Sequence, residues 1–304
     1  MLDKITCYIC IGLSSSGKST IGKALAKFHN ITYVSSDEIR AEISTWEDQS
    51  RNEEVFNIFH KRIRDGLNSG IGCVCDATNI TIKSRKQIID IAKRIPNVEI
   101  VGVVMAIPWI GCVVRDCNRE HKVGENVIVK QLRKFEMPFF EEGFDDIVFV
   151  KTMPSCYETT GDIANYLTLM DNFNQENPYH QHDLLTHSFL VAKEFQRTYP
   201  KYGIGALYHD FGKLTTKRKD EDGVAHYYNH ENVGAYDFFT TLMYDKDYND
   251  KLTTRDIIDN TFLINYHMRP FNWKEPRTVE KYKKIFGEDK TEMLIYFNEL
   301  DQKY

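Results

Sequence analysis

The chain has 304 residues, of which 42% are hydrophobic and 27% charged, and its formal net charge is −5. These values exclude a disordered or low-complexity chain, and the length predicts two domains. No stretch approaches 18 consecutive apolar residues, so the sequence predicts no membrane span. The N-terminus leads into an expected strand without a signal-peptide pattern, which favours a cytoplasmic protein.

All seven cysteines lie within the first 156 residues. Four of them fall in expected strands: Cys7, Cys10, Cys73 and Cys75. Their positions favour small buried hydrophobic side chains in a reducing compartment. The alternative is a zinc site made from the two pairs, and the expected burial on strands argues against it.

The stretch GLSSSGKST at residues 12–20 matches the phosphate-loop pattern G-x-x-x-x-G-K-[ST] at every fixed position. A β-rich apolar run, residues 5–11, precedes it, and residues 21–28 have helical spacing. A chance match would lack this context. Glycines let the backbone wrap an anion, Lys18 supplies a cation, and Ser19 is placed to hold Mg²⁺ between nucleotide phosphates. The expected nucleotide contacts are Gly12, Ser14, Ser15, Ser16, Gly17, Lys18, Ser19 and Thr20.

Strand-like and helical segments alternate over the first half of the chain. The expected strands are residues 5–11, 31–35, 72–75, 98–107 and 146–150. The expected helices after the first lie near residues 37–44, 53–67, 83–94 and 127–135. This alternation predicts an α/β domain with a parallel sheet and helices on both faces. Catalytic residues are then expected at the carboxyl ends of the strands.

Two aspartates follow expected strands. Asp37 would lie near the γ-phosphate as a proton acceptor, and Arg40 on the same helix turn would orient a phosphate. Asp76 would hold Mg²⁺ through water. For each aspartate the alternative is a plain helix N-cap, because Asp caps helices well. Local sequence leaves both interpretations open.

Arg115 and Arg119 are four residues apart and are expected to project from one helical face. In a kinase such a pair belongs to a lid that closes over the nucleotide and stabilises the transferring charge. A solvated charged face is the alternative.

Taken together, these segments resemble the polynucleotide 5′-hydroxyl kinase family. The resemblance covers about residues 5–150 and includes the phosphate loop, S-D-x-x-R at 36–40, D-x-T-N at 76–79 and R-x-x-x-R at 115–119. The run from Val127 to Phe144 is also similar. The resemblance implies that Asp37 is the general base, that Lys18 and Ser19 handle phosphates and metal, and that three arginines engage phosphates: Arg40, Arg115 and Arg119. The lid differs in offering Glu120 and Glu125 in place of a compact basic run.

We place the domain boundary after an expected helix at residues 161–170, which gives domains of residues 1–171 and 172–304. Helical periodicity dominates the second domain. Histidines and aspartates recur along it: His182, His187, His209, Asp210, His230, His267 and Asp301. Imidazoles and carboxylates on several helices are how a bundle builds an internal metal centre. Any one of these histidines alone would be more typical of a surface or core residue.

This order of residues resembles the HD phosphohydrolase superfamily over about residues 178–304, in the subgroup related to the C-terminal domains of some tRNA nucleotidyltransferases. The resemblance implies that one metal is held by His187, His209, Asp210 and Asp301. It implies that His230 and His267 hold a second metal in binuclear members, and that Lys213 lies near a substrate phosphate. One or two divalent ions are expected, from among Mn²⁺, Mg²⁺, Ni²⁺, Co²⁺ and Fe²⁺.

The sequence therefore predicts an α/β P-loop kinase domain followed by an all-α HD domain. The predicted activities are an ATP-dependent (or other NTP-dependent) 5′-hydroxyl kinase and a metal-dependent 3′/2′-phosphatase or cyclic phosphodiesterase. The substrates would be RNA or DNA ends, with RNA favoured, and a separate nucleic-acid ligase is a candidate partner. The alternatives are a nucleoside or small-metabolite kinase fused to an HD nucleotidase, and a non-enzymatic nucleotide switch with a binding module.

Overall fold

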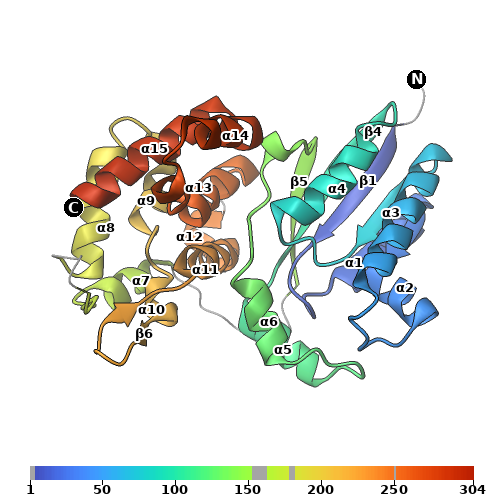
Figure 1. Ribbon diagram of the computed structural model, residues 1–304, viewed down its shortest axis with the longest axis horizontal. Coiled ribbons are helices and arrows are strands. Elements are labelled where there is room, and N and C mark those ends of the chain that lie inside the picture. The colour runs from blue at the N-terminus through green and yellow to red at the C-terminus, as the bar shows by residue number, and fades with distance from the viewer. Residues whose placement is uncertain (1–3, 153–162, 178–181, 250) are drawn as a thin grey trace. The chain divides into compact units, whose positions relative to one another are not determined.

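The computed structural model describes residues 4–152, 163–177, 182–249 and 251–304 (Figure 1). They form two compact units. The first contains residues 4–131 and 142–152, and the second contains residues 132–141 with the described residues from 163 to 304. The predicted boundary after residue 171 thus falls inside the second unit. Its position differs because the helix at 163–170 packs against other helices of that unit. Cys156 and the first two residues of the predicted helix at 161–170 lie outside the described residues.

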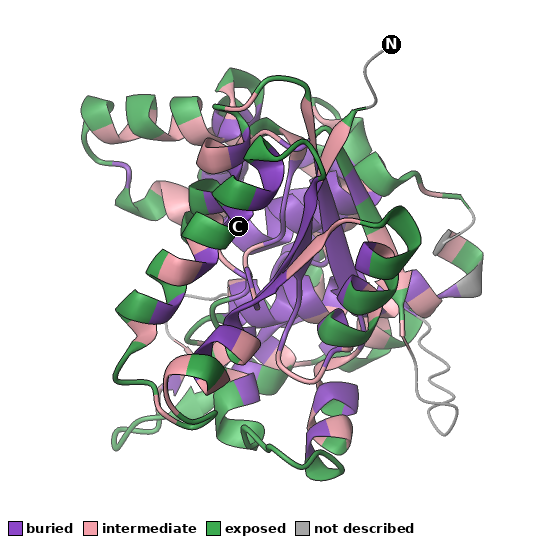
Figure 2. Ribbon diagram, turned by 90° about the vertical axis from the view of Figure 1, so that its right-hand side faces the viewer, coloured by how far each residue is buried: buried purple, intermediate pink, exposed green. Residues whose placement is uncertain are grey.

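A five-stranded parallel sheet forms the centre of the first unit, in the order β2-β3-β1-β4-β5. The strands are β1 Ile5–Ile11, β2 Thr32–Ser35, β3 Cys73–Asp76, β4 Val98–Ala106 and β5 Asp146–Lys151. Each lies within one residue of its predicted bounds at either end. Buried strands between helices with exposed outer faces are visible in Figure 2.

Helices cover both faces of this sheet, as predicted. They are α1 Lys18–His29, α2 Ser36–Ile43, α3 Asn52–Asn68, α4 Ile82–Ala92, α5 Trp109–Cys117 and α6 Glu125–Leu132. A Cβ atom at Gly22 of α1 would lie 3.3 Å from Val74, and one at Gly66 of α3 would lie 3.6 Å from Cys73. Neighbouring residues of a strand point to opposite faces, so α1 and α3 pack on opposite sides.

The cysteines on β1 and β3 are buried free thiols, as the sequence predicts. The Sγ atom of Cys7 lies 3.8 Å from those of Cys73 and Cys75. Cys10 packs instead with Ala26 on the other face of the sheet. The four cysteines of the alternative zinc site therefore do not converge.

The helix predicted near residues 127–135 ends at Leu132, because Phe135 takes part in the second unit. The carbonyl oxygen of Phe135 accepts hydrogen bonds from Asn232 Nδ2 at 2.7 Å and Asn265 Nδ2 at 3.0 Å. The Phe135 ring packs edge-on against Tyr236, with centroids 4.9 Å apart. The carbonyl oxygen and the ring of Phe135 are thus engaged within the second unit and not by a continuation of α6.

The second unit is helical, as predicted, apart from one short hairpin. Its α-helices are α7 Ile163–Met170, α8 Leu184–Phe195, α9 Gly203–Leu207, α10 Lys213–Thr216, α11 His230–Tyr244, α12 Lys246–Asn249, α13 Thr254–Tyr266, α14 Pro276–Phe286 and α15 Glu288–Lys303. The 3-10 turns η2 Pro200–Tyr202 and η3 Arg269–Asn272 complete the helical segments, and η1 Phe140–Glu142 lies where the chain passes from residues of this unit to residues of the first. The hairpin pairs β6 Arg218–Lys219 with β7 Ala225–His226. Gly223, with φ +79°, makes its turn possible.

Two glycines bring the turn after α9 against its neighbours. A Cβ atom at Gly205 would lie 2.5 Å from the carbonyl oxygen of Asn260, and one at Gly212 would lie 2.1 Å from that of His230. Only glycine permits these approaches, which fix the intervening residues 209 and 210 against α11 and α13. None of the helices in the described ranges is long and apolar enough to cross a lipid bilayer.

Candidate nucleotide site and candidate metal centre

The phosphate loop connects β1 to α1 and is built from left-handed backbone at Ser15 (φ 63°) and Gly17 (φ 97°). Lys18 is buried at the start of α1, and its Nζ donates a 2.7 Å hydrogen bond to the carbonyl oxygen of Leu13. Burial lowers the pKa of Lys18, while the carboxylates of Asp76 and Asp37 oppose that shift. Ser19 and Thr20 are exposed in the first turn of α1.

Asp76 is buried at the end of β3 and is held by a tyrosine that sequence reasoning missed. Tyr33 donates its hydroxyl to Asp76 Oδ2 at 2.5 Å. Burial and the Asp76 carboxylate raise the pKa of Tyr33. Hydrogen bonds with the side chains of Ser19 and Ser35 offset part of this rise. The N-cap of α4 is Thr81, so Asp76 is not a helix cap.

Asp37 lies exposed in the first turn of α2, which is capped by Ser35. The alternative in which Asp37 is the N-cap is therefore excluded. Arg40 is buried on the same helix, and its guanidinium donates to the carbonyl oxygen of Asp48 at 2.8 Å and to Asn52 Oδ1 at 2.6 Å. In this arrangement Arg40 stabilises the loop that joins α2 to α3.

The two arginines of the predicted lid do not share a helical face, which corrects the prediction. α5 ends at Cys117, and the N–H of Arg119 bonds to the carbonyl oxygen of Asp116 in a following turn. Beyond Cys117 the bonds run from residue i to i−3 in turns, and the Asp116 carboxylate accepts the backbone N–H groups of Val123 and Gly124 in the segment that follows. Both arginines still reach the phosphate loop. Arg115 Nη1 donates to the carbonyl oxygen of Ser16 at 3.2 Å, and Arg119 Nη1 lies 3.1 Å from Ser15 Oγ.

Two further side chains support the phosphate loop, and no motif in the sequence identifies them. Asp116 Oδ1 accepts a 2.9 Å hydrogen bond from Ser15 Oγ. Gln131 of α6 accepts from the N–H of Ser14 at 2.8 Å and donates to Ser14 Oγ at 2.9 Å. The loop is thus positioned by the segments on both sides of the lid.

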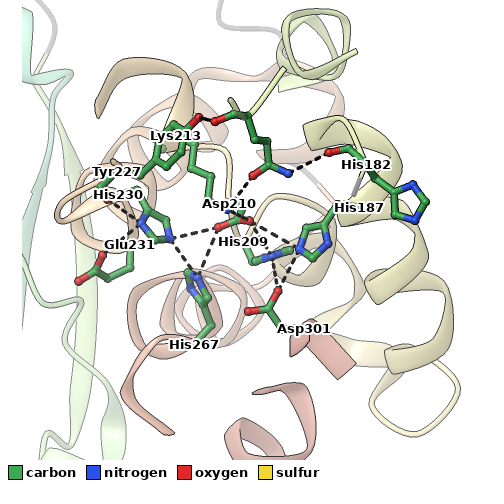
Figure 3. Close-up of polar contacts among 12 residues, drawn as sticks. His182, His187, His209, Asp210, Lys213, Tyr227, His230, Glu231, His267 and Asp301 are labelled. Atoms are coloured by element: carbon green, nitrogen blue, oxygen red, sulfur yellow. Dashed lines mark hydrogen bonds and ion pairs between the residues drawn. The ribbon is translucent and has the colours of Figure 1, made fainter. Parts of the chain in front are cut away.

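A second candidate site lies within the second unit, where four ligand-type side chains from three parts of the chain meet (Figure 3). His187 comes from α8, His209 and Asp210 from the turn after α9, and Asp301 from α15. His187 Nε2 lies 3.0 Å from Asp301 Oδ1, and His209 Nε2 lies 3.2 Å from the same atom. Asp210 Oδ2 is 3.3 Å from His209 Nε2.

A second cluster shares Asp210 with the first. Asp210 Oδ1 lies 3.1 Å from His230 Nε2 and 3.7 Å from His267 Nε2. The two imidazole Nε2 atoms are 3.3 Å apart. The two oxygens of one carboxylate therefore face two separate groups of nitrogen atoms, as Figure 3 shows.

Backbone carbonyls fix the orientation of three of these imidazoles. His209 Nδ1 lies 2.9 Å from the carbonyl oxygen of Ala206, and His230 and His267 make the same contact at 2.8 Å. A carbonyl only accepts, so each Nδ1 carries a hydrogen and each ring directs its Nε2 atom into the cluster. Among the described residues, no hydrogen bond of acceptable geometry satisfies the buried His209 Nε2. Nε2 atoms placed in this way fit metal coordination, in which the ion takes the place of the Nε2 proton.

Charge at this centre is dominated by Asp210 and Asp301. Burial would lower the pKa of His209, but the two carboxylates raise it to about 10. Burial would also raise the pKa of Asp210, whereas Lys213 and His209 hold it well below its ordinary range. Carboxylates held ionised among imidazoles match the donor set of divalent first-row metals.

Lys213 adjoins the centre on the side opposite Asp301. Its Nζ lies 2.6 Å from Asp210 Oδ2 and donates to Gln175 Oε1 at 2.9 Å. Sequence reasoning missed Gln175, because it lies 38 residues before Lys213 and belongs to no motif. His182 is exposed and points away from the cluster in Figure 3.

Comparison with known proteins bears on the first unit. Residues 8–138 match the family described as AAA domain. Curated proteins give no significant match. The solved structures that match include a Pnkp1/Rnl/Hen1 RNA repair complex (20% identity, 42% of this chain, TM-score 0.38), a fungal RNA kinase (16%, 55%, 0.37) and a gluconokinase from Sinorhizobium meliloti 1021 (19%, 49%, 0.36).

The chain covers 43% of the matched repair-complex chain, 44% of the RNA kinase and 84% of the gluconokinase. TM-scores below 0.5 do not assign a common fold. The family match, the phosphate loop and the parallel sheet together fit a P-loop kinase fold for the first unit.

Proposed function

We propose that the protein heals broken nucleic-acid ends at two separate active sites. The first unit transfers the γ-phosphate of ATP, or of another NTP, to a 5′-hydroxyl. The second unit removes a terminal 3′- or 2′-phosphate or opens a 2′,3′-cyclic phosphate. RNA is the favoured substrate.

In the first unit, Asp37 accepts the proton of the attacking hydroxyl, and its exposure on α2 leaves it accessible to a polymer end. Lys18, Arg115 and Arg119 neutralise charge on the phosphates. Ser19 would hold Mg²⁺ directly and Asp76 through water, with the Tyr33 hydrogen bond fixing the Asp76 carboxylate. ATP with Mg²⁺ supplies the transferable phosphoryl group.

In the second unit, one divalent metal would be held by His187, His209, Asp210 and Asp301. A second would be held by Asp210, His230 and His267. Such ions supply an activated water and polarise phosphoryl oxygens. Lys213 cannot ligate a metal, because an ammonium group has no lone pair, so it would contact the substrate phosphate.

The observation that carries this proposal is the assembly of five ligand-type side chains around the carboxylate of Asp210. A purely structural ion-pair network would not need three imidazoles whose Nδ1 atoms are all bonded to carbonyls. The two proposed activities also complement each other at a broken end. A ligase requires a 5′-phosphate and a 3′-hydroxyl, and the two proposed activities produce both.

The test is to incubate the full protein with ATP, Mg²⁺ or Mn²⁺, and oligonucleotides carrying a 5′-hydroxyl and a 3′-phosphate or 2′,3′-cyclic phosphate. We expect both ends to be converted. Lys18→Ala should abolish 5′ phosphorylation alone, and His209→Ala with Asp210→Ala should abolish the 3′ reaction alone. Each variant's surviving activity reports that it is folded. Faster phosphorylation of free nucleosides or sugars than of polymer ends would favour the small-molecule kinase instead, and unchanged ends would refute the proposal.

A further inference from the structure

An exposed aromatic pair stands beside the candidate nucleotide site and takes no part in it. The Trp46 indole stacks on the His121 imidazole, with ring centroids 5.0 Å apart and planes inclined by 14°. Trp46 is 36% exposed, and the side chain of His121 is 44% exposed. Aromatic surface that remains exposed to water is available to stack on a ligand.

Electrostatics do not account for this pair. His121 Nδ1 lies 4.0 Å from Glu47 Oε1, and both side chains are exposed. An ion pair of this kind contributes little to stability, because water screens it and two flexible side chains must be ordered.

Hydrogen bonds tie down both loops that present the aromatic pair. Trp46 belongs to the loop between α2 and α3, where Asp48 accepts hydrogen bonds from the N–H of Ser50 at 2.8 Å and from Ser44 Oγ at 2.5 Å. Arg40 Nη1 donates to the carbonyl oxygen of Asp48 at 2.8 Å. His121 belongs to the turn that Asp116 closes by accepting two backbone N–H groups. A preformed aromatic surface loses little entropy when a ligand binds.

The position of the pair relates it to the acceptor substrate. α2 carries Asp37 in its first turn, and Trp46 follows three residues after the end of this helix. Arg119, two residues before His121, contacts Ser15 of the phosphate loop. From residue 37 to residue 43 the helix rises about 9 Å at 1.5 Å per residue. Two or three stacked nucleotides, at about 3.4 Å each, span the same length. A strand that meets Asp37 with its 5′-hydroxyl and runs along α2 would bring its second or third base towards the loop that carries Trp46.

We infer that Trp46, supported by His121, is a stacking surface for an unpaired base near the 5′ end of the acceptor strand. This inference rests on the proposed kinase function and specifies its substrate as single-stranded nucleic acid. Stacking uses the π-face that every base has, so the surface tolerates all four bases. His121 extends the aromatic surface and fixes the plane of the indole.

The experiment compares the full-length wild-type protein with Trp46→Ala, Trp46→Phe and the control Phe28→Ala. Phe28 is 84% exposed near the end of α1, far along the helix from the phosphate loop. Each protein phosphorylates a single-stranded 5′-hydroxyl hexanucleotide and the same strand with abasic residues at its first three positions. Quenching of tryptophan fluorescence by the unmodified strand gives a second readout that does not require turnover.

We expect Trp46→Ala to raise KM for the intact strand about tenfold, in line with the measured strength of base–aromatic stacking, with KM for ATP unchanged. KM of Trp46→Phe for the intact strand should stay within about threefold of the wild-type value. With wild type, KM for the abasic strand should exceed KM for the intact strand by the same factor. With Trp46→Ala, KM should be equal for the two strands, because the substitution and the missing bases remove the same interaction. Phe28→Ala should behave as wild type.

The inference would be overturned if Trp46→Ala left KM for the intact strand unchanged. It would also be overturned if removing the bases still raised KM with the Trp46→Ala protein. A wild-type protein that phosphorylates no 5′-hydroxyl end would overturn the proposed kinase function instead. Fluorescence then decides about Trp46 alone: quenching that Trp46→Ala abolishes supports the stacking surface, and the absence of quenching in wild type refutes it.

Discussion

The hydroxyl of Tyr33 donates a 2.5 Å hydrogen bond to Asp76 Oδ2 and so joins the ends of two neighbouring strands beside the phosphate loop. The raised pKa of Tyr33, caused by burial and by the carboxylate, keeps this hydroxyl protonated at neutral pH. Asp76 is 4% exposed, so few water molecules are available to replace the tyrosine. The orientation of a proposed magnesium-binding carboxylate therefore depends on a residue outside every recognised motif.

Tyr33→Phe should lower kcat for 5′ phosphorylation about tenfold and the free energy of unfolding by about 2 kcal/mol, because a buried carboxylate loses its partner. Phosphorylation assays and urea denaturation measure the two effects. Tyr8→Phe is the matched control, since the Tyr8 hydroxyl lies at the surface, 3.2 Å from His29 Nε2. Equal behaviour of the two variants would contradict this role for Tyr33.

Asp37→Asn should reduce kcat for 5′ phosphorylation by about 10²–10⁴-fold with little change in KM for ATP, because an amide cannot accept the proton. The fold should be unaffected, since Ser35 caps α2. Steady-state kinetics with varied ATP and varied oligonucleotide provide the measurement. A raised KM with kcat intact would mean that Asp37 binds substrate and does not act as a base.

The metal content of the second unit should approach two ions per chain when Mn²⁺ is plentiful and fall towards one when it is limiting, because two nearby cations repel each other. Asp301→Ala should weaken the first site and His267→Ala only the second. Asp210→Ala should weaken both, since its two oxygens face both clusters. Elemental analysis and calorimetric titration of the purified variants measure these differences. Loss of a single ion in Asp210→Ala would argue against a shared ligand.

Asp116→Asn should destabilise the first unit in a manner that depends on pH. Burial would raise the pKa of Asp116, but the N–H groups of Gly124 and Val123 and the Ser15 hydroxyl together lower it below its ordinary value. The stabilisation from the carboxylate is therefore present above its unfolded-state pKa of about 3.9 and is lost as pH falls through the lower folded-state pKa. Thermal unfolding of wild type and variant should differ most above about pH 4 and converge below it. A constant difference across this range would exclude the carboxylate charge as the cause.

The strands and the phosphate loop were predictable because their signals are local. Apolar β-rich runs bounded by turn residues gave all five strands to within one residue, and the pattern at 12–20 required only its neighbours in sequence. The convergence of His187 and Asp301, 114 residues apart, could not follow from periodicity. This convergence was predicted only because the order of histidines and aspartates resembles that of a known superfamily.

Features that depend on distant or competing partners were not predictable. A four-residue spacing placed Arg119 on the face of Arg115, but the helix ends at Cys117 and Arg119 lies in the turn that follows, where Asp116 binds the backbone N–H groups of residues 123 and 124. Gln175 and Tyr33 are ordinary polar residues whose partners, Lys213 and Asp76, lie 38 and 43 residues away. Their roles arise from tertiary packing alone.

The path of the chain through residues 132–141 limits how the protein can be divided. Phe135 and Phe139 fill the interior of the helical unit, although both precede the last strand of the sheet in sequence. The ring centroids of Phe139 and Phe262 are 5.1 Å apart. No single cut in the polypeptide separates the two units intact. A gene fragment that begins after the sheet would encode a helical unit with two aromatic rings missing from its centre. The two units are therefore not interchangeable parts joined end to end, and a recombination event that transferred the helical unit alone would also have to transfer ten residues from inside its neighbour.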